Sequence, residues 1–177
     1  MNPTDHESGL TPEELREIID YNAETGIFTW KNCPGNNTHH RNGKVAGYPR
    51  GKARYIVITI YKRNYVASRL AWLYMTGVWP AHNVDHVDLD PSNNKWGNLR
   101  AATYSQNNAN RRSPKRITGL PRGVSRGTIP NLKKAYEARI KVNKKSIYLG
   151  MFETPGAAHE AYLKAQKKYF GEYGRSK

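Results

Sequence analysis

Cysteine, phenylalanine and acidic residues are scarce in this sequence, and it contains no long apolar run. The single cysteine, Cys33, excludes an intramolecular disulfide bond and a zinc site built from several cysteines. No segment approaches the roughly 18 apolar residues that a membrane-spanning helix needs, and the acidic first residues lack the basic start of a signal peptide. These absences predict a protein of a reducing cytoplasm that has no membrane partner.

The shortage of acidic residues leaves a strong and uneven positive charge. The 177 residues include 29 Lys and Arg against 14 Asp and Glu, a net charge of +15. Residues 1–110 hold 12 basic and 10 acidic side chains, whereas residues 111–177 hold 17 and 4. The C-terminal third therefore carries +13 and is expected to anchor the protein on a polyphosphate backbone. Since only 37% of the residues are hydrophobic, we expect small modules rather than one large core.

The N-terminal part alternates predicted elements with polar loops. A helix is predicted over residues 10–22, with Thr11 as its N-cap and Pro12 at its first position. A turn at Thr25–Gly26 leads into a strand, and a polar loop fills residues 32–51.

A hairpin and a helix are predicted next. Residues alternate from position 54 as they do in a strand, and a turn is predicted at Arg63–Asn64. Ser68 is predicted to cap a helix over residues 69–76, which Gly77 ends. We expect this hairpin and helix to support the stretch that follows them.

The stretch from Asn83 to Asn108 gathers acid, imidazole and carboxamide groups at spacings that suit chemistry. Its pattern predicts a strand, a polar loop, a second strand and a helix. In such a unit Asp85 and Asn107 can converge on one hard cation through oxygen. The adjacent His86 faces the other way, because neighbouring strand residues point to opposite sides, and can take a proton from water.

This stretch resembles the ββα-metal core of HNH endonucleases, in the phage homing-endonuclease branch whose third signature residue is Asn. The resemblance implies that Asp85 and Asn107 are metal ligands, that His86 is the general base, and that Asn98 braces the loop that carries the base. Asn108 is an adjacent alternative to Asn107. The implied cofactor is one Mg²⁺ or Mn²⁺ ion, which would offset charge on the phosphate.

Two points qualify this resemblance. An Asp-His pair before an Asn-rich loop also occurs where these residues only build turns, and it is the longer pattern of DHVD, NN, NLR and QNN that favours catalysis. Relatives commonly have His where this chain has Ser68, so any role of that position is open.

The C-terminal part resembles a second family. Residues 109–119 form a basic segment, with Arg111 and Arg112, that we expect to be a linker along phosphates. From residue 120 the chain is similar to the Apetala-two/ethylene-response-factor (AP-two/ERF) DNA-binding domain, which implies a three-stranded antiparallel sheet on one helix. Strands are predicted near 122–126, 135–142 and 146–149, with a turn at Asn143–Lys144 and a helix that Thr154 caps.

The outer face of that sheet is predicted to bind the major groove through basic and aromatic side chains. Its members are Arg122, Arg126, Tyr136, Arg139, Lys141 and Tyr148, and Lys144 of the turn is a further expected DNA contact. Relatives usually place Trp at Tyr136 and acidic residues at Pro155–Gly156, so the base that is read stays open. The alternative is that the two tyrosines are core or solvent-exposed aromatics.

Together these patterns predict an α+β protein: a disordered segment 1–9, an HNH endonuclease domain over 10–108, the linker 109–119 and an AP-two/ERF-like domain over 120–174. The function expected is a site-specific, metal-dependent endonuclease that acts on double-stranded DNA in the cytoplasm of a bacterial host during phage infection. A non-catalytic DNA-binding regulator on an HNH shell is the main alternative, and an RNA-binding protein is a third. A monomer is favoured, and the oligomeric state is left open. The sequence leaves open the recognition site, the preferred metal and whether one strand or both are cut.

Overall fold

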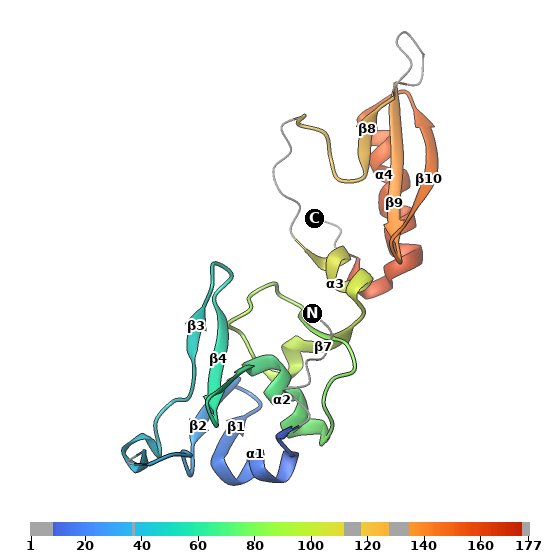
Figure 1. The fold of residues 1–177 in the computed structure, drawn as a ribbon. Helices are drawn as coiled ribbons and strands as arrows, with labels where there is room; N and C mark the ends of the chain where they lie inside the picture. The colour runs from blue at the N-terminus through green and yellow to red at the C-terminus, as the bar shows by residue number, and fades with distance from the viewer. Residues whose placement is uncertain (1–8, 37, 112–117, 128–134, 175–177) are drawn as a thin grey trace. The chain divides into compact units, whose positions relative to one another are not determined.

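The computed structural model describes residues 9–36, 38–111, 118–127 and 135–174, and its contacts divide the chain into two compact units (Figure 1). The first unit is Met1–Ala102 and the second is Thr103–Lys177. The predicted disorder of residues 1–9 falls, apart from Gly9, outside the described residues, as does Arg112. The predicted domain and linker boundaries stay predictions, although the division of the two units comes six residues before the expected end of the endonuclease domain.

Unit 1 begins with helix α1 (Pro12–Ile18). The predicted cap is confirmed, because Thr11 and Glu14 form a reciprocal capping box. The prediction that the helix continues to residue 22 is wrong. Ile19–Asn22 form strand β1, which pairs antiparallel with β2 (Ile27–Trp30). Pairing with β2 buries Ile19 completely, so tertiary packing overrides the helical pattern there.

A second sheet in unit 1 has the order β3–β4–β5, with β3 (Tyr48–Arg50), β4 (Tyr55–Ile60) and β5 (Arg63–Val66). The predicted turn at Arg63–Asn64 is wrong, because both residues lie in β5. The chain turns at Tyr61–Lys62, whose φ angles are 48° and 63°. Turn residues with a positive φ are usually Gly or Asn. Asn64 therefore favoured a predicted turn that lies two residues after the actual one. The strand β3 lies in what the sequence predicts to be a polar loop.

Helix α2 (Ala67–Thr76) packs behind this sheet and completes the core of unit 1. The predicted cap by Ser68 is wrong: Val66 is the N-cap, without a side-chain hydrogen bond, and Ser68 is buried in the first turn. Gly77 ends the helix with φ 75°, as predicted. The core joins α1, the β1–β2 hairpin, the sheet and α2, and its largest buried side chains include Leu15, Ile19, Phe28, Ile58, Ile60, Leu70 and Leu73.

The strand, loop, strand and helix predicted for Asn83–Asn108 are all present. Strand β6 (Asn83–His86) pairs antiparallel with β7 (Leu99–Ala102), and the short 3-10 helix η3 (Trp96–Asn98) precedes β7. Helix α3 (Tyr104–Asn110) follows and opens with a second capping box, between Thr103 and Gln106.

Unit 2 confirms the predicted three-stranded sheet on one helix. The strand order is β10–β9–β8, with β8 (Val124–Arg126), β9 (Tyr136–Val142) and β10 (Lys145–Phe152). Helix α4 (Pro155–Phe170) lies against one face of this sheet (Figure 1) and begins with the predicted cap, since Thr154 accepts from the Ala157 backbone. A short 3-10 helix, η4 (Gly171–Tyr173), follows it.

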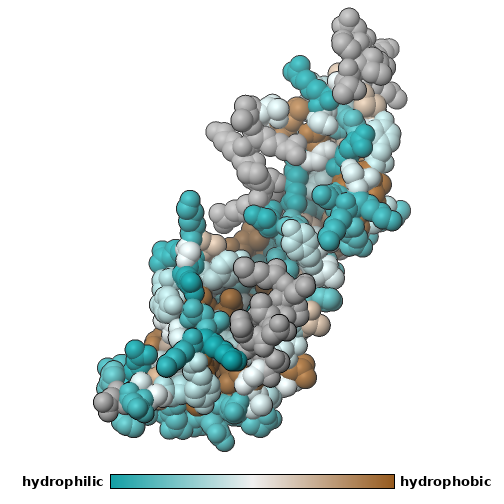
Figure 2. Space-filling model, viewed as in Figure 1, coloured by the Kyte–Doolittle hydropathy of each residue, from teal (hydrophilic) through white to brown (hydrophobic). Residues whose placement is uncertain are grey.

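The face of the molecule drawn in Figure 2 is largely polar. In the view of Figure 2, hydrophobic side chains appear as small patches between hydrophilic ones. In the parts of the chain that the structure describes, no helix has the length and apolar character required to cross a membrane.

Candidate active site and nucleic-acid surface

Asp85 and His86 are consecutive residues of strand β6, and each is only 5% exposed. Asp85 lies directly opposite Arg100 in the register with β7. Both Nε and Nη2 of Arg100 are 3.0 Å from Oδ2 of Asp85. The Asp85 carboxylate is therefore buried together with a compensating positive charge, as a buried carboxylate requires.

His86 contacts a different neighbour. Its Nε2 lies 3.2 Å from Oδ1 of Asn94, which is 2% exposed. Asn94 is itself oriented, because its Nδ2 donates to the Ser92 carbonyl at 3.2 Å. An oxygen that faces Nε2 requires Nε2 to carry the hydrogen, and Nδ1 is then the nitrogen that can accept a proton.

Asn98 ties together the loop between β6 and β7. Its Oδ1 accepts from the Asp88 backbone at 3.1 Å, and its Nδ2 donates to Asp88 Oδ1 at 2.9 Å and to the Asn93 carbonyl at 2.8 Å. Partial burial would raise the pKa of the Asp88 carboxyl, but hydrogen bonds from the Asp90 backbone, Asn93 and Asn98 hold that pKa below its ordinary value. The charged carboxylate favours the folded loop above the ordinary carboxyl pKa, and this contribution is lost as pH falls through the lowered value.

The β1–β2 hairpin holds the same loop from outside. The Tyr21 hydroxyl donates to the Asn94 carbonyl at 2.7 Å, and burial raises the pKa of Tyr21 to about 12, so this donor keeps its proton. The Trp96 backbone donates to the Ala23 carbonyl at 2.9 Å. Gly26 sits at this contact with φ 74°, and a Cβ there would lie 2.4 Å from backbone atoms of Asn94 and Lys95.

Gly26→Ala is therefore expected to displace the Asn94–Lys95 backbone. We expect a loss of about 1–3 kcal/mol in the free energy of unfolding, measured by urea denaturation. Gly51→Ala is the matched control, because Gly51 has the same φ of 74° and nothing within 4 Å of its Cβ position. Equal losses of stability from the two substitutions would show that the close approach at Gly26 does not matter.

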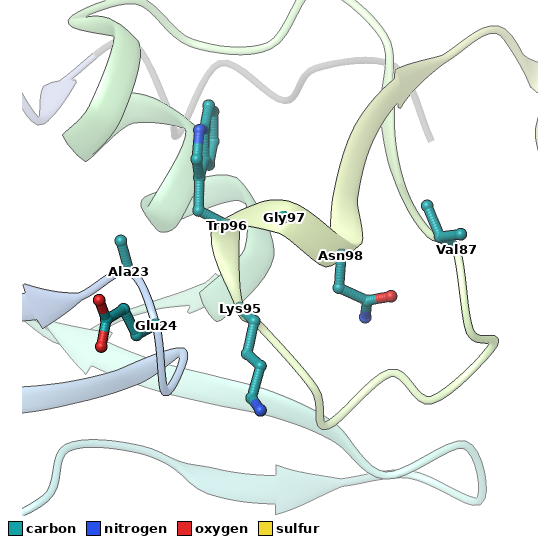
Figure 3. Close-up of a pocket in the computed structure, with 7 residues that line it drawn as sticks. All are labelled: Ala23, Glu24, Val87, Lys95, Trp96, Gly97 and Asn98. Atoms are coloured by element: carbon teal, nitrogen blue, oxygen red, sulfur yellow. The ribbon is translucent and has the colours of Figure 1, made fainter.

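A pocket of about 520 Å³ lies where the hairpin meets the loop (Figure 3). Ala23 and Glu24 line it from the β1–β2 turn, and residues 95–98 line it from the segment that enters β7, with Val87 completing the wall. The lining includes Asn98 but neither Asp85 nor His86. The pocket is therefore not formed by the predicted Asp85 and His86 pair.

The second predicted metal ligand, Asn107, lies half-buried on α3. Contacts group α3 with unit 2, whereas Asp85 belongs to unit 1. The convergence of Asp85 and Asn107 on one cation therefore stays a prediction.

Three of the residues predicted on the outer sheet face of unit 2 lie elsewhere. The Arg122 guanidinium donates to the backbone carbonyls of α3. Tyr136 packs against the cluster of Val124 and Ala138 on the side that faces α4. Arg126 is exposed but lies opposite Tyr136 in the register, so its side chain leaves the sheet on that same side. The outer-face placement is wrong for all three.

Arg139, Lys141 and Tyr148 do share the outer face. All three are exposed, and the Arg139 guanidinium lies over the Tyr148 ring, 5.6 Å from its centroid. Arg139 also forms an ion pair with Glu137. Exposed basic side chains adjoin this face at the Lys144 turn, and Arg111 is exposed at the end of α3.

The structure adds residues that the sequence did not single out. Arg100 follows Asn98 by two positions, and an antiparallel register for β6 and β7 would have placed it opposite Asp85. Asn94 belonged to the Asn-rich pattern, but its contact with His86 depends on the path of the loop. Tyr21 offered no signal, because it is 73 positions from Asn94.

Comparison with known proteins supports the nuclease interpretation of this region. The family model described as HNH endonuclease matches residues 65–109. No curated protein and no solved structure matches the chain. The match covers α2, β6, the loop with Asn98, β7 and nearly all of α3, which are the elements that carry the four predicted catalytic and metal-binding residues. Residues 65–109 are an HNH endonuclease domain.

Proposed function

We propose that the protein is a site-specific, divalent-metal-dependent DNA endonuclease of the phage homing type, which nicks or cuts double-stranded DNA in the cytoplasm of a bacterial host. The observation that carries this proposal is the position of His86 within the HNH endonuclease domain. Asn94 fixes its ring through Nε2, and the Asp85 carboxylate is its neighbour on β6.

His86 acts as the general base. With Nε2 donating to Asn94, the Nδ1 atom accepts a proton from a water molecule, whose oxygen attacks the phosphorus as the bond to the leaving oxygen breaks. Asn94 and Asn98 are positioning residues: the first orients the ring, and the second holds the loop that contains the first.

The residues present fit a hard divalent cation. Asp85 and Asn107 offer carboxylate and carboxamide oxygen, which suit Mg²⁺ or Mn²⁺ better than zinc. Among the described residues, no three His, Cys, Asp or Glu side chains gather as a metal site, and Mg²⁺ is commonly held by one or two carboxylates together with substrate phosphates. When bound, the ion would offset negative charge that develops on the phosphate.

DNA is held by basic side chains from more than one part of the chain. On unit 2 the proposed contacts are Arg139, Lys141 and Tyr148 on the outer face and Lys144 in the adjoining turn, together with Arg111 and Arg126, which are exposed elsewhere on the unit. In unit 1, residues 25–84 contain nine Lys and Arg and no Asp or Glu. The near-neutral total of residues 1–110 hides this basic segment, since the acidic residues cluster before and after it.

Lys141→Ala is expected to weaken DNA binding uniformly across sequences and to reduce the slope of log affinity against log salt by about 0.9, the value of one phosphate contact. A salt titration of binding by fluorescence anisotropy measures this slope. Lys164→Ala is the control, because Lys164 is an exposed residue of α4, which covers the opposite face of the sheet. If both substitutions change the slope equally, the outer face has no special role.

A non-catalytic DNA-binding regulator is the competing function. One observation favours it: Asp85 and His86 are each only 5% exposed, and Arg100 engages Asp85 Oδ2. Incubation of supercoiled plasmid with purified protein and Mg²⁺ or Mn²⁺ separates the two functions. Conversion to nicked or linear DNA, blocked by EDTA, supports the endonuclease, whereas tight binding without conversion supports the regulator.

A further inference from the structure

The rest of unit 2 holds helix α3 at its first turn. The Asn143 backbone, in the turn between β9 and β10, donates to Oγ of Ser105 at 3.1 Å. Asn143 and Lys144 have φ angles of 47° and 67°, as a tight two-residue hairpin turn requires. The tip of this hairpin therefore contacts the start of the helix that carries Asn107.

Arg122 holds the other end of α3. Its Nη2 donates to the Asn108 carbonyl at 2.8 Å, and its Nη1 donates to the carbonyls of Ala109 at 2.9 Å and Arg111 at 3.2 Å. The last carbonyls of a helix have no partner within the helix, and a cation there also interacts favourably with the helix dipole. One guanidinium thus donates to three carbonyls at the end of α3, of which the Ala109 carbonyl also accepts from Nε2 of Gln166 at 3.5 Å.

The backbone that carries Arg122 is fixed against α4. The Arg122 carbonyl lies 3.0 Å from Nδ1 of His159. Gly123 has φ 80°, and a Cβ on it would lie 2.0 Å from the Tyr162 ring, so only glycine fits at this approach. Arg122 is therefore attached to a rigid part of the sheet and helix unit.

The side of α3 is also part of the core of unit 2. Ala109 is 3% exposed and packs in one cluster with Ile140, Tyr162 and Phe170. A helix of seven residues has little stability by itself, so α3 depends on these contacts for its position.

We infer that the sheet and helix unit is a working part of the nuclease, in which Arg122 is a positioning residue that fixes α3 and hence the metal ligand that α3 offers. This inference rests on the proposed function, in which Asn107 binds the cation. Arg122 is accordingly not a base-reading residue: its guanidinium is committed to backbone carbonyls. Unit 2, which carries most of the positive charge expected to bind DNA, would then also determine the metal-ion concentration that cleavage requires.

The test uses the full chain with Arg122→Ala, Arg122→Lys and Lys164→Ala. Three quantities are measured: Mn²⁺ binding by calorimetry, hydrogen exchange of the α3 amides, and the Mg²⁺ dependence of single-turnover plasmid nicking. We expect Arg122→Ala to weaken Mn²⁺ binding and raise the Mg²⁺ requirement by about 10–100-fold, as loss of a residue that orients a ligand does. Exchange of residues 104–110 should be roughly five- to tenfold faster, in line with loss of a helix cap.

Arg122→Lys distinguishes this role from contact with phosphate. An ammonium preserves the charge but not the planar fork that reaches several carbonyls, so Arg122→Lys should keep DNA affinity and still show fast exchange and weak Mn²⁺ binding. Lys164→Ala should leave all three quantities unchanged.

Full restoration by lysine, or unchanged exchange and Mn²⁺ affinity in Arg122→Ala, would overturn the inference. A wild-type protein that binds Mn²⁺ but does not nick DNA would overturn the proposed nuclease activity and leave Arg122 as a positioning residue for the metal ligand. A wild-type protein that binds no Mn²⁺ would overturn both.

Discussion

His86→Ala is expected to lower the single-turnover rate of plasmid nicking by about 10²–10⁴-fold, the usual contribution of a positioned general base. DNA affinity should stay within roughly threefold, because the base acts on water and contributes little to ground-state binding. The substitution also removes the partner of a buried carboxamide, so urea denaturation of the variant should accompany the kinetics. A modest loss of stability cannot account for a rate change of this size in protein that remains folded.

His82→Ala is the matched control for this experiment. His82 is exposed, and it is the backbone carbonyl of this residue, not its ring, that accepts from Arg69 at 2.8 Å. Loss of the ring should leave cleavage unchanged. Normal nicking by His86→Ala at neutral pH would remove His86 from the mechanism and favour the regulator.

Truncation after Asn110 is expected to remove both tight DNA binding and cleavage. Residues 111–177 carry a net charge of +13, so the salt dependence of binding should flatten by about 0.9 for each phosphate that the shortened protein no longer neutralises. The sequence alone favoured a simple division in which the N-terminal part cuts and the C-terminal part only anchors. The contacts of α3 with Arg122 and the Ile140 cluster instead predict that truncated protein fails to nick DNA even at low salt, where binding persists.

The full chain with Arg139→Ala and Lys141→Ala is the control for the truncation. It loses two outer-face charges but keeps every contact of α3, so it should bind weakly at moderate salt and still cleave at a near-normal single-turnover rate at low salt. Circular dichroism of the truncated protein checks that the core of unit 1 is intact. Cleavage by a folded truncated protein would show that α3 does not need residues 111–177.

Local chemistry in the sequence predicted much of the fold. The capping box at Thr11, the stop at Gly77, the turn at Asn143–Lys144 and the cap at Thr154 are each specified by residues within four positions of one another. The order of strand, loop, strand and helix in the endonuclease domain also follows from the pattern of polar residues. Such features need no knowledge of the tertiary structure.

The predictions were wrong where the structure depends on packing between residues far apart in the sequence, or on which face of a sheet a strand residue points to. Ile19 continues a helical pattern but pairs with Trp30 in a sheet. Tyr136 and Arg139 are three positions apart, and an odd separation in a strand puts two side chains on opposite faces. The partners of Arg122 lie 11–14 positions earlier in the chain. No local sequence pattern could show that Arg122 binds the carbonyls of a helix rather than DNA.

The contact between the Tyr21 hydroxyl and the Asn94 carbonyl has a consequence for the order of folding. It joins residues 73 positions apart in the sequence. A contact between such distant positions forms only after the entropic cost of closing a long loop has been met. The loop that orients His86 cannot take its final shape until the first hairpin and the strands after it are assembled. We therefore expect catalytic competence to arise late in the folding of the chain, so that a ribosome-bound fragment shorter than about one hundred residues would have no nuclease activity.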